Sequence, residues 1–195
     1  MPLTAPQSNN KKGFEAGVYN AICYSVLDIG THDGKFGKKH QICLGWKFYE
    51  FTYEDGNYVS YHQTYTLSLN QKAKLRELLQ GWVLKDEKYP EAYDLQKLLG
   101  QQCKLILAPN ANGTISAKNA ISYTETEQIE PIKPEFFSFA DWDGGELPKF
   151  LLEDRNQWKR ERIQQSEEYI TQGEVNQDHA DENRVNDLAD EDIPF

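Results

Sequence analysis

The feature that most constrains the fold is the alternation in HQICLGWKFYEFTY, residues 40–53. Apolar side chains recur there with a period of two, which predicts a half-buried β-strand. The core face takes Ile42, Leu44, Trp46 and Phe48, and the opposite face takes Lys39, Gln41, Cys43, Gly45, Lys47, Tyr49 and Phe51. The flanking segments 17–29 and 58–69 are rich in β-branched and aromatic residues and predict two further strands. We therefore expect a three-stranded meander.

The next part of the chain predicts one helix and then two more strands. Ser68 and Gln71 have the spacing of a capping box, and residues 70–82 have helical periodicity. A short helical piece ends at Gly100, and residues 102–109 and 114–125 predict strands joined by a turn. Five strands with a helix between the third and fourth is the element order of an OB-fold. The predicted class is all-β with one or two helices, as a five-stranded Greek-key barrel.

Charge divides the chain into a slightly basic body and an acidic end. Residues 1–124 carry 14 Lys and Arg against 11 Asp and Glu, whereas residues 125–195 carry 7 against 20. Residues 166–195 hold ten acids and one base, without apolar periodicity, which predicts a disordered acidic tail. We therefore expect a flexible N-terminus (1–16), a barrel domain (17–126), a linker with a possible helix (127–165) and the tail (166–195).

Rings and cations are interleaved on the second and third strands and in the loop before them. Aromatic rings stack on bases and ammonium groups meet phosphates, so this composition favours binding of single-stranded nucleic acid with little sequence preference. The glycines of the loop at residues 30–40 allow close approach of the backbone to a phosphate. The candidate residues are Lys35, Phe36, Lys38, Lys39, Lys47, Tyr49, Phe51, Tyr58 and His62.

No catalytic or metal-binding constellation is found. Residues 30–35, GTHDGK, resemble a truncated phosphate loop, but Phe36 stands where Ser or Thr is needed and a strand follows in place of a helix. Asp28, His32 and Asp33 read as a polar turn rather than a metal site, and the three cysteines read as buried apolar side chains. We expect neither an enzyme nor a cofactor.

The body from Gly17 to Glu125, with SLNQKAKLRELLQGW and YDLQKLLGQQCKLIL, resembles phage-type single-stranded DNA-binding proteins of replication and recombination. The end of the chain, DLADEDIPF, is similar to the acidic tip by which bacterial single-stranded DNA-binding proteins recruit partners. The resemblance implies that the protein coats and protects unpaired DNA during replication, recombination and repair. Its partners would be a nuclease, helicase, primase or polymerase, bound through Asp190, Glu191, Asp192, Ile193, Pro194 and Phe195.

Other readings stay open at this point. The main alternative is an OB-fold replisome adaptor that binds proteins but no nucleic acid, and a homodimer is possible. A membrane partner is not expected, because no apolar stretch reaches the ~20 residues that cross a bilayer. We expect a cytoplasmic protein, in a bacterium or a phage-infected host.

Overall fold

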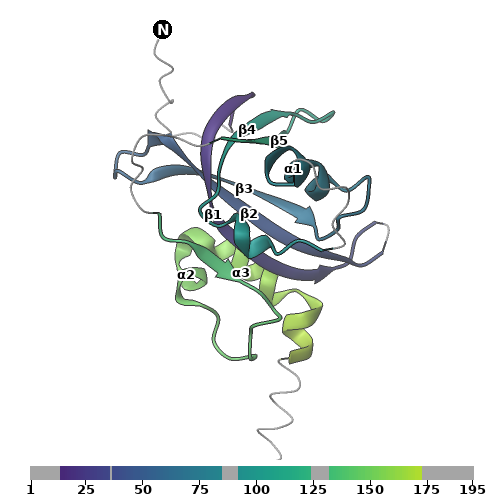
Figure 1. Ribbon diagram of the computed structural model, residues 1–195. Coiled ribbons are helices and arrows are strands. Elements are labelled where there is room, and N and C mark those ends of the chain that lie inside the picture. The colour runs from purple at the N-terminus through teal and green to yellow at the C-terminus, as the bar shows by residue number, and fades with distance from the viewer. Residues whose placement is uncertain (1–13, 36, 85–91, 124–131, 173–195) are drawn as a thin grey trace, which may run out of the picture. The chain divides into compact units, whose positions relative to one another are not determined.

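The computed structural model describes residues 14–35, 37–84, 92–123 and 132–172 (Figure 1). These residues form a mostly β structure with few helices. A six-stranded sheet has the order β3-β2-β1-β4-β5, and β6 pairs with β1 off this path. The strands are β1 (Gly17–His32), β2 (Lys39–Thr52), β3 (Tyr58–Thr66), β4 (Gln102–Pro109), β5 (Ile115–Ser122) and β6 (Glu135–Phe137).

The helices are short. They are α1 (Lys74–Trp82), the 3-10 turn η1 (Leu95–Leu98), α2 (Lys149–Leu152), the 3-10 turn η2 (Asp154–Asn156) and α3 (Gln157–Gln164). Residues 167–172 are also helical. Every helix of the described part of the chain is too short or too polar to cross a bilayer.

The chain divides into two compact units. Unit 1 comprises residues up to Leu27 and Ile42–Phe136, and unit 2 comprises Asp28–Gln41 and the residues from Phe137 onward. The long strands β1 and β2 therefore contribute to both units. This division differs from the expected barrel domain of 17–126, because the end of β1, the turn after it and the start of β2 group with the C-terminal part of the chain.

Unit 1 has an apolar core built from the alternating face of β2. Trp46 and Phe48 are buried there with Leu75, Leu79 and Trp82 of α1. Burying side chains of this size stabilises by about 1.5–3 kcal/mol each. The indole N–H of Trp82 donates to the carbonyl of Gln102 at 2.9 Å, which ties α1 to the start of β4.

Side chains connect the two strands that end the sheet order. The Gln63 amide on β3 donates to the carbonyl of Ala117 on β5 at 3.2 Å and accepts from the Ala117 N–H at 2.6 Å. The Tyr61 hydroxyl donates to the same amide oxygen at 2.7 Å. Gln63 thus supplies, from a side chain, one donor and one acceptor of the kind that a neighbouring strand offers.

The five predicted strands are present as β1–β5, with ends that differ, and a sixth, β6, lies in the segment expected to be a linker. The first strand continues to His32, so the connection predicted at 30–40 shortens to a turn. The helix begins at Lys74 with Ala73 as its N-cap and no capping side chain, so the capping-box prediction at Ser68 is wrong. The Ser68 hydroxyl accepts from the Asn70 N–H instead, forming a local turn before the helix.

Two segments that were expected to be unfolded are ordered over a few residues. Phe14, expected in a flexible N-terminus, packs edge-on against Phe48 and Tyr61, with ring centroids 5.5 and 5.1 Å apart. The segment 166–172, expected to begin a disordered tail, is helical from residue 167. The rest of the expected tail lies outside the described residues.

Unit 2 has a small core of its own around aromatic rings. Phe137, Phe139 and Trp142 contact one another with centroids 5.1–6.2 Å apart. Trp142 stacks on Tyr169 at 5.0 Å with 10° between the ring planes, which fixes the helical segment 167–172 to this core. The possible helix expected in the linker is present as α2, η2 and α3.

Candidate nucleic-acid interface

In unit 1, the face of β1–β3 opposite the apolar core around Trp46 gathers two rings and a cation, and one of the rings, Tyr24, is buried. The ammonium group of Lys47 lies 4.9 Å from the centre of the Tyr24 ring. The Tyr24 hydroxyl is 2.7 Å from Nε2 of His62, and their rings are 5.6 Å apart at 70°. Three neighbouring strands therefore place a lysine, a tyrosine and a histidine together. Lys47 and His62 were predicted site residues, and Tyr24 was not.

Gly45 makes room for this cluster. A Cβ atom at residue 45 would lie 2.7 Å from Cδ2 of His62 and 2.8 Å from Cβ of Ser25, which is closer than real Cβ contacts. The absence of a side chain on β2 therefore lets the His62 imidazole lie over the strand and reach Tyr24. Sequence reasoning placed Gly45 on this face but gave it no role.

The other predicted residues of unit 1 lie in different settings. Tyr49 and Tyr58 are half-buried on β2 and β3. Phe51 packs against the apolar core, with its ring 6.1 Å from that of Tyr19, so it does not face away from the core as the alternation suggested. The alternation is therefore lost at the end of β2.

Unit 2 holds the lysines of the predicted loop. Lys35 and Lys38 are exposed in the turn, and Lys39 is half-buried at the start of β2. The Lys38 ammonium group pairs with Glu167 at 2.8 Å, and the two side chains are 60% and 51% exposed. This pair raises the pKa of Lys38, chiefly through its hydrogen bond to Glu167. Phe36 lies outside the described residues.

His40 lies beside Lys38 between two carboxylates. Its Nε2 is 2.7 Å from Asp28 Oδ1, and its Nδ1 is 3.1 Å from Glu168 Oε1. The hydrogen bond to Asp28 is the main cause of a raised pKa for His40, with further contributions from the charges of Asp28 and Glu168. Because both ring nitrogens face carboxylate oxygens, the arrangement suits the imidazolium form, in which both nitrogens donate.

Asp28, His40 and Thr31 are connected in sequence, as the acid, base and hydroxyl nucleophile of a catalytic triad are, but the hydroxyl proton does not point to the imidazole. His40 Nδ1 is 3.1 Å from the Thr31 hydroxyl. That hydroxyl donates to Glu168 at 2.5 Å, so its proton is directed away from the imidazole that would have to accept it. Within the described residues, no group of three or more His, Cys, Asp or Glu could hold a metal ion.

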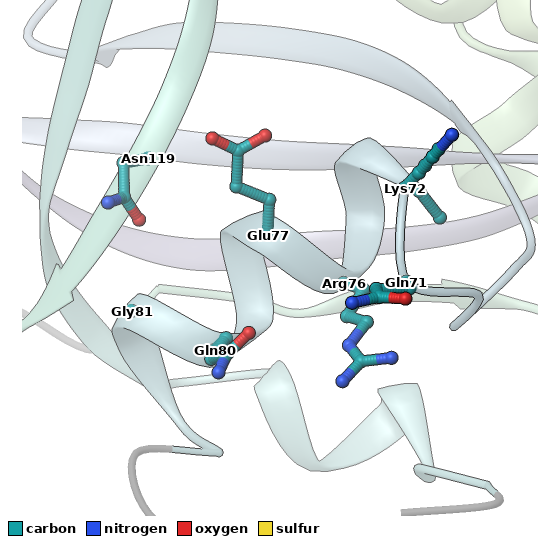
Figure 2. Close-up of a pocket in the computed structure, with 8 residues that line it drawn as sticks. Gln71, Lys72, Arg76, Glu77, Gln80, Gly81 and Asn119 are labelled. Carbon is teal, nitrogen blue, oxygen red and sulfur yellow. The ribbon is translucent and has the colours of Figure 1, made fainter. Parts of the chain in front are cut away.

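An open pocket of about 400 Å³ lies beside α1 in unit 1 (Figure 2). Its lining side chains come from α1, the residues before it and β5, and they include Lys72, Arg76 and Glu77. Arg76 donates to the carbonyl of Leu69 at 3.2 Å, so it supports the turn that precedes the helix. The predicted site residues do not line this pocket.

Sequence reasoning did not assign a site role to Tyr24, Asp28 or His40, nor to Thr31, Glu167 and Glu168. Tyr24 has the same ring chemistry as the chosen tyrosines, but nothing local to its strand pairs it with residue 62. Asp28 was assigned to a polar turn and His40 to the start of a strand, and their pairing follows from the β1–β2 hairpin, which brings residues twelve apart together. The predicted tip, Asp190 to Phe195, lies outside the described residues and stays a prediction.

Comparison of the chain with protein-family models, with curated proteins and with solved structures finds no match. The functional argument therefore depends on the residues and their geometry.

Proposed function

We propose that this protein binds single-stranded DNA without strong sequence preference and keeps it unpaired during replication, recombination or repair. The observation that carries the proposal is the cluster of Lys47, Tyr24 and His62 on one face of β1–β3. Tyr24 is buried and holds His62 in place, so the phosphate contact would come from the half-buried Lys47 and the stacking surface from the half-buried ring of His62. The half-buried Tyr49 and Tyr58 lie on β2 and β3, and their rings extend the supply of stacking groups.

The OB-fold is part of this proposal. The order β3-β2-β1-β4-β5, with α1 between β3 and β4 in the chain, is the order of a five-stranded Greek-key barrel opened between β3 and β5. The Gln63 bridge to Ala117 joins those two end strands and supports closure. In an OB-fold, ligands bind on the second and third strands, which are the strands that carry Lys47 and His62.

The acidic tip is proposed to recruit partner enzymes of replication and repair, such as a nuclease, helicase, primase or polymerase. Phe195 offers a ring, and the preceding acids add attraction to a basic pocket rim. The site of action would be the cytoplasm of a bacterium or a phage-infected cell. This part of the proposal follows from the sequence of residues 190–195 alone.

Fluorescence anisotropy of a labelled oligo-dT tests the DNA-binding proposal. We expect Tyr58→Ala to weaken binding by roughly tenfold, because one stacked base contributes about 1–3 kcal/mol. Lys47→Ala should weaken binding and lower the dependence of log K on log salt by about 0.7, the change expected when one phosphate contact is lost. Lys97→Ala, which removes an exposed cation from η1, is the matched control.

Failure of the wild-type protein to bind oligo-dT at low salt would favour the adaptor alternative. Equal affinities for Lys47→Ala, Tyr58→Ala and Lys97→Ala would show that the strand lies on another surface.

A further inference from the structure

The carboxylate of Glu168 is held by an arrangement of donors that resembles an anion site. The Thr31 N–H donates to Oε2 at 2.6 Å, and the Thr31 hydroxyl donates to Oε1 at 2.5 Å. His40 Nδ1 lies 3.1 Å from the same Oε1. A backbone amide, a hydroxyl and an imidazole are also the groups that bind phosphate oxygens in protein–DNA contacts. We call these donors of Thr31 and His40 the hairpin cradle.

The contact is built closely into unit 2. Gly30, with φ +77°, lies so near Ser166 and Glu168 that an added Cβ would be 2.6 Å from Ser166 Oγ and 2.7 Å from Glu168 Oε2. Ser166 is fully buried, and its hydroxyl accepts from the Tyr169 N–H at 3.3 Å, which caps the helical segment 167–172. Glu167 and Glu168 are the first two residues of that segment, where negative charge is favoured.

The Glu168 carboxylate in the cradle is partly accessible to solvent and has a cation nearby. Glu168 is 28% exposed, and the neighbouring Glu167 holds Lys38, whose side chain is 60% exposed. Asp28 lies on the far side of His40 and favours its protonated form. A second anion reaching this place would thus meet the amide and hydroxyl of Thr31, the His40 imidazole and the Lys38 ammonium group, each engaged by a carboxylate of the chain itself.

We propose that the hairpin cradle is a phosphate site for single-stranded DNA, and that Glu168 in the cradle and Glu167 on the adjacent Lys38 hold these groups until a backbone phosphate displaces them. This inference rests on the proposed function and adds a contact in unit 2 to the ring cluster of unit 1. The ligand class is the phosphodiester of an unpaired strand. The carboxylates take the places of phosphate oxygens, so they compete with DNA for Thr31, His40 and Lys38.

The first test compares two double variants that change the net charge equally. Glu167→Gln/Glu168→Gln removes the competing charges and keeps the side-chain shape. Glu153→Gln/Glu161→Gln removes two exposed carboxylates of unit 2 whose partners are Arg155 and Gln157 and not the cradle donors. We expect the first variant to bind oligo-dT about fivefold more tightly than the wild type at low salt, a factor in the usual range for coupled binding events. The second should change affinity less than twofold.

Equal gains for both double variants would mean that net charge alone acts, and an unchanged or lower affinity for the first variant would overturn the inference. Nuclear magnetic resonance on the wild-type protein gives a second reading that needs no variant. On titration with oligo-dT, the Thr31 backbone amide and the His40 ring nitrogens should shift and saturate together with binding.

The two proposals fail in different ways. A wild-type protein that binds oligo-dT while the Thr31 and His40 resonances stay in place would refute the cradle and leave the proposed function intact. A wild-type protein and a Glu167→Gln/Glu168→Gln variant that both fail to bind would refute the proposed function. Binding by the variant alone would support both, since it would show that the carboxylates block the strand.

Discussion

The bridge from Gln63 to Ala117 predicts a measurable loss of stability when it is removed. Gln63→Leu deletes one donor and one acceptor that serve the backbone of Ala117, whose residue is only 6% exposed. The Tyr61 hydroxyl also loses its acceptor on Gln63, and a typical intramolecular hydrogen bond contributes about 0.5–1.5 kcal/mol, so the three bonds predict a loss of about 1.5–4.5 kcal/mol. The Tyr61 hydroxyl, 3.2 Å from the Ala117 nitrogen, still accepts from the Ala117 N–H, which favours the lower half of that range.

Urea unfolding and amide hydrogen exchange provide the assay. With a denaturant slope of about 2 kcal/mol/M, a loss of about 2 kcal/mol lowers the midpoint by about 1 M. The Ala117 amide should also exchange faster with solvent. Thr64→Val, an exposed neighbour on β3, is the control and should stay within about 0.5 kcal/mol of the wild type. If Gln63→Leu matched the control in midpoint and the Ala117 exchange rate were unchanged, the bridge would contribute nothing to closure.

Further predictions concern titration, packing, thiols and the tail. Because folding raises the pKa of His40, protonation of His40 stabilises the folded protein, fully below about pH 6.5 and progressively less as the pH rises through the folded-state pKa. His40→Gln should remove this dependence on pH from thermal melts followed between about pH 5 and 9. Gly45→Ala should displace His62 and destabilise by about 1–3 kcal/mol in urea unfolding, whereas an unchanged midpoint would contradict the close packing. Burial raises the pKa of Cys23 to about 12, so a thiol reagent at neutral pH should label the native protein slowly and the unfolded protein at once. Deleting residues 187–195 should leave oligo-dT affinity equal or higher and abolish partner capture in a pull-down; a large loss of DNA affinity would oppose the scheme.

The local patterns of the sequence predict the strands well because their cause is local. The two-residue period of β2 follows from which side chains enter the core, and Gly113 ends the β4–β5 turn with φ +80°, a conformation suited to glycine. The burial of all three cysteines is confirmed for the same reason, since each lies within an apolar strand. The start of α1 was misjudged because a hydroxyl before a helix also satisfies a local turn.

The candidate site was less predictable because its contacts join distant residues. Thr31 and Glu168 are 137 positions apart, and Tyr24 and His62 are 38 apart. No periodicity within β1 indicates which side chain will lie opposite position 62 or 168. The residue types of the predicted loop gave its charge correctly, but only the fold shows that Lys38 already has Glu167 as a partner.

The most direct test of the DNA-binding proposal is an equilibrium titration of the wild-type protein with one oligonucleotide in single-stranded and duplex form, at two salt concentrations. The tryptophan and tyrosine fluorescence reports binding. We predict quenching that saturates with the single strand, weakens as salt rises, and is at least tenfold weaker with the duplex, whose bases are stacked and hidden. Equal affinity for both forms, or no quenching by either at low salt, would contradict the proposal.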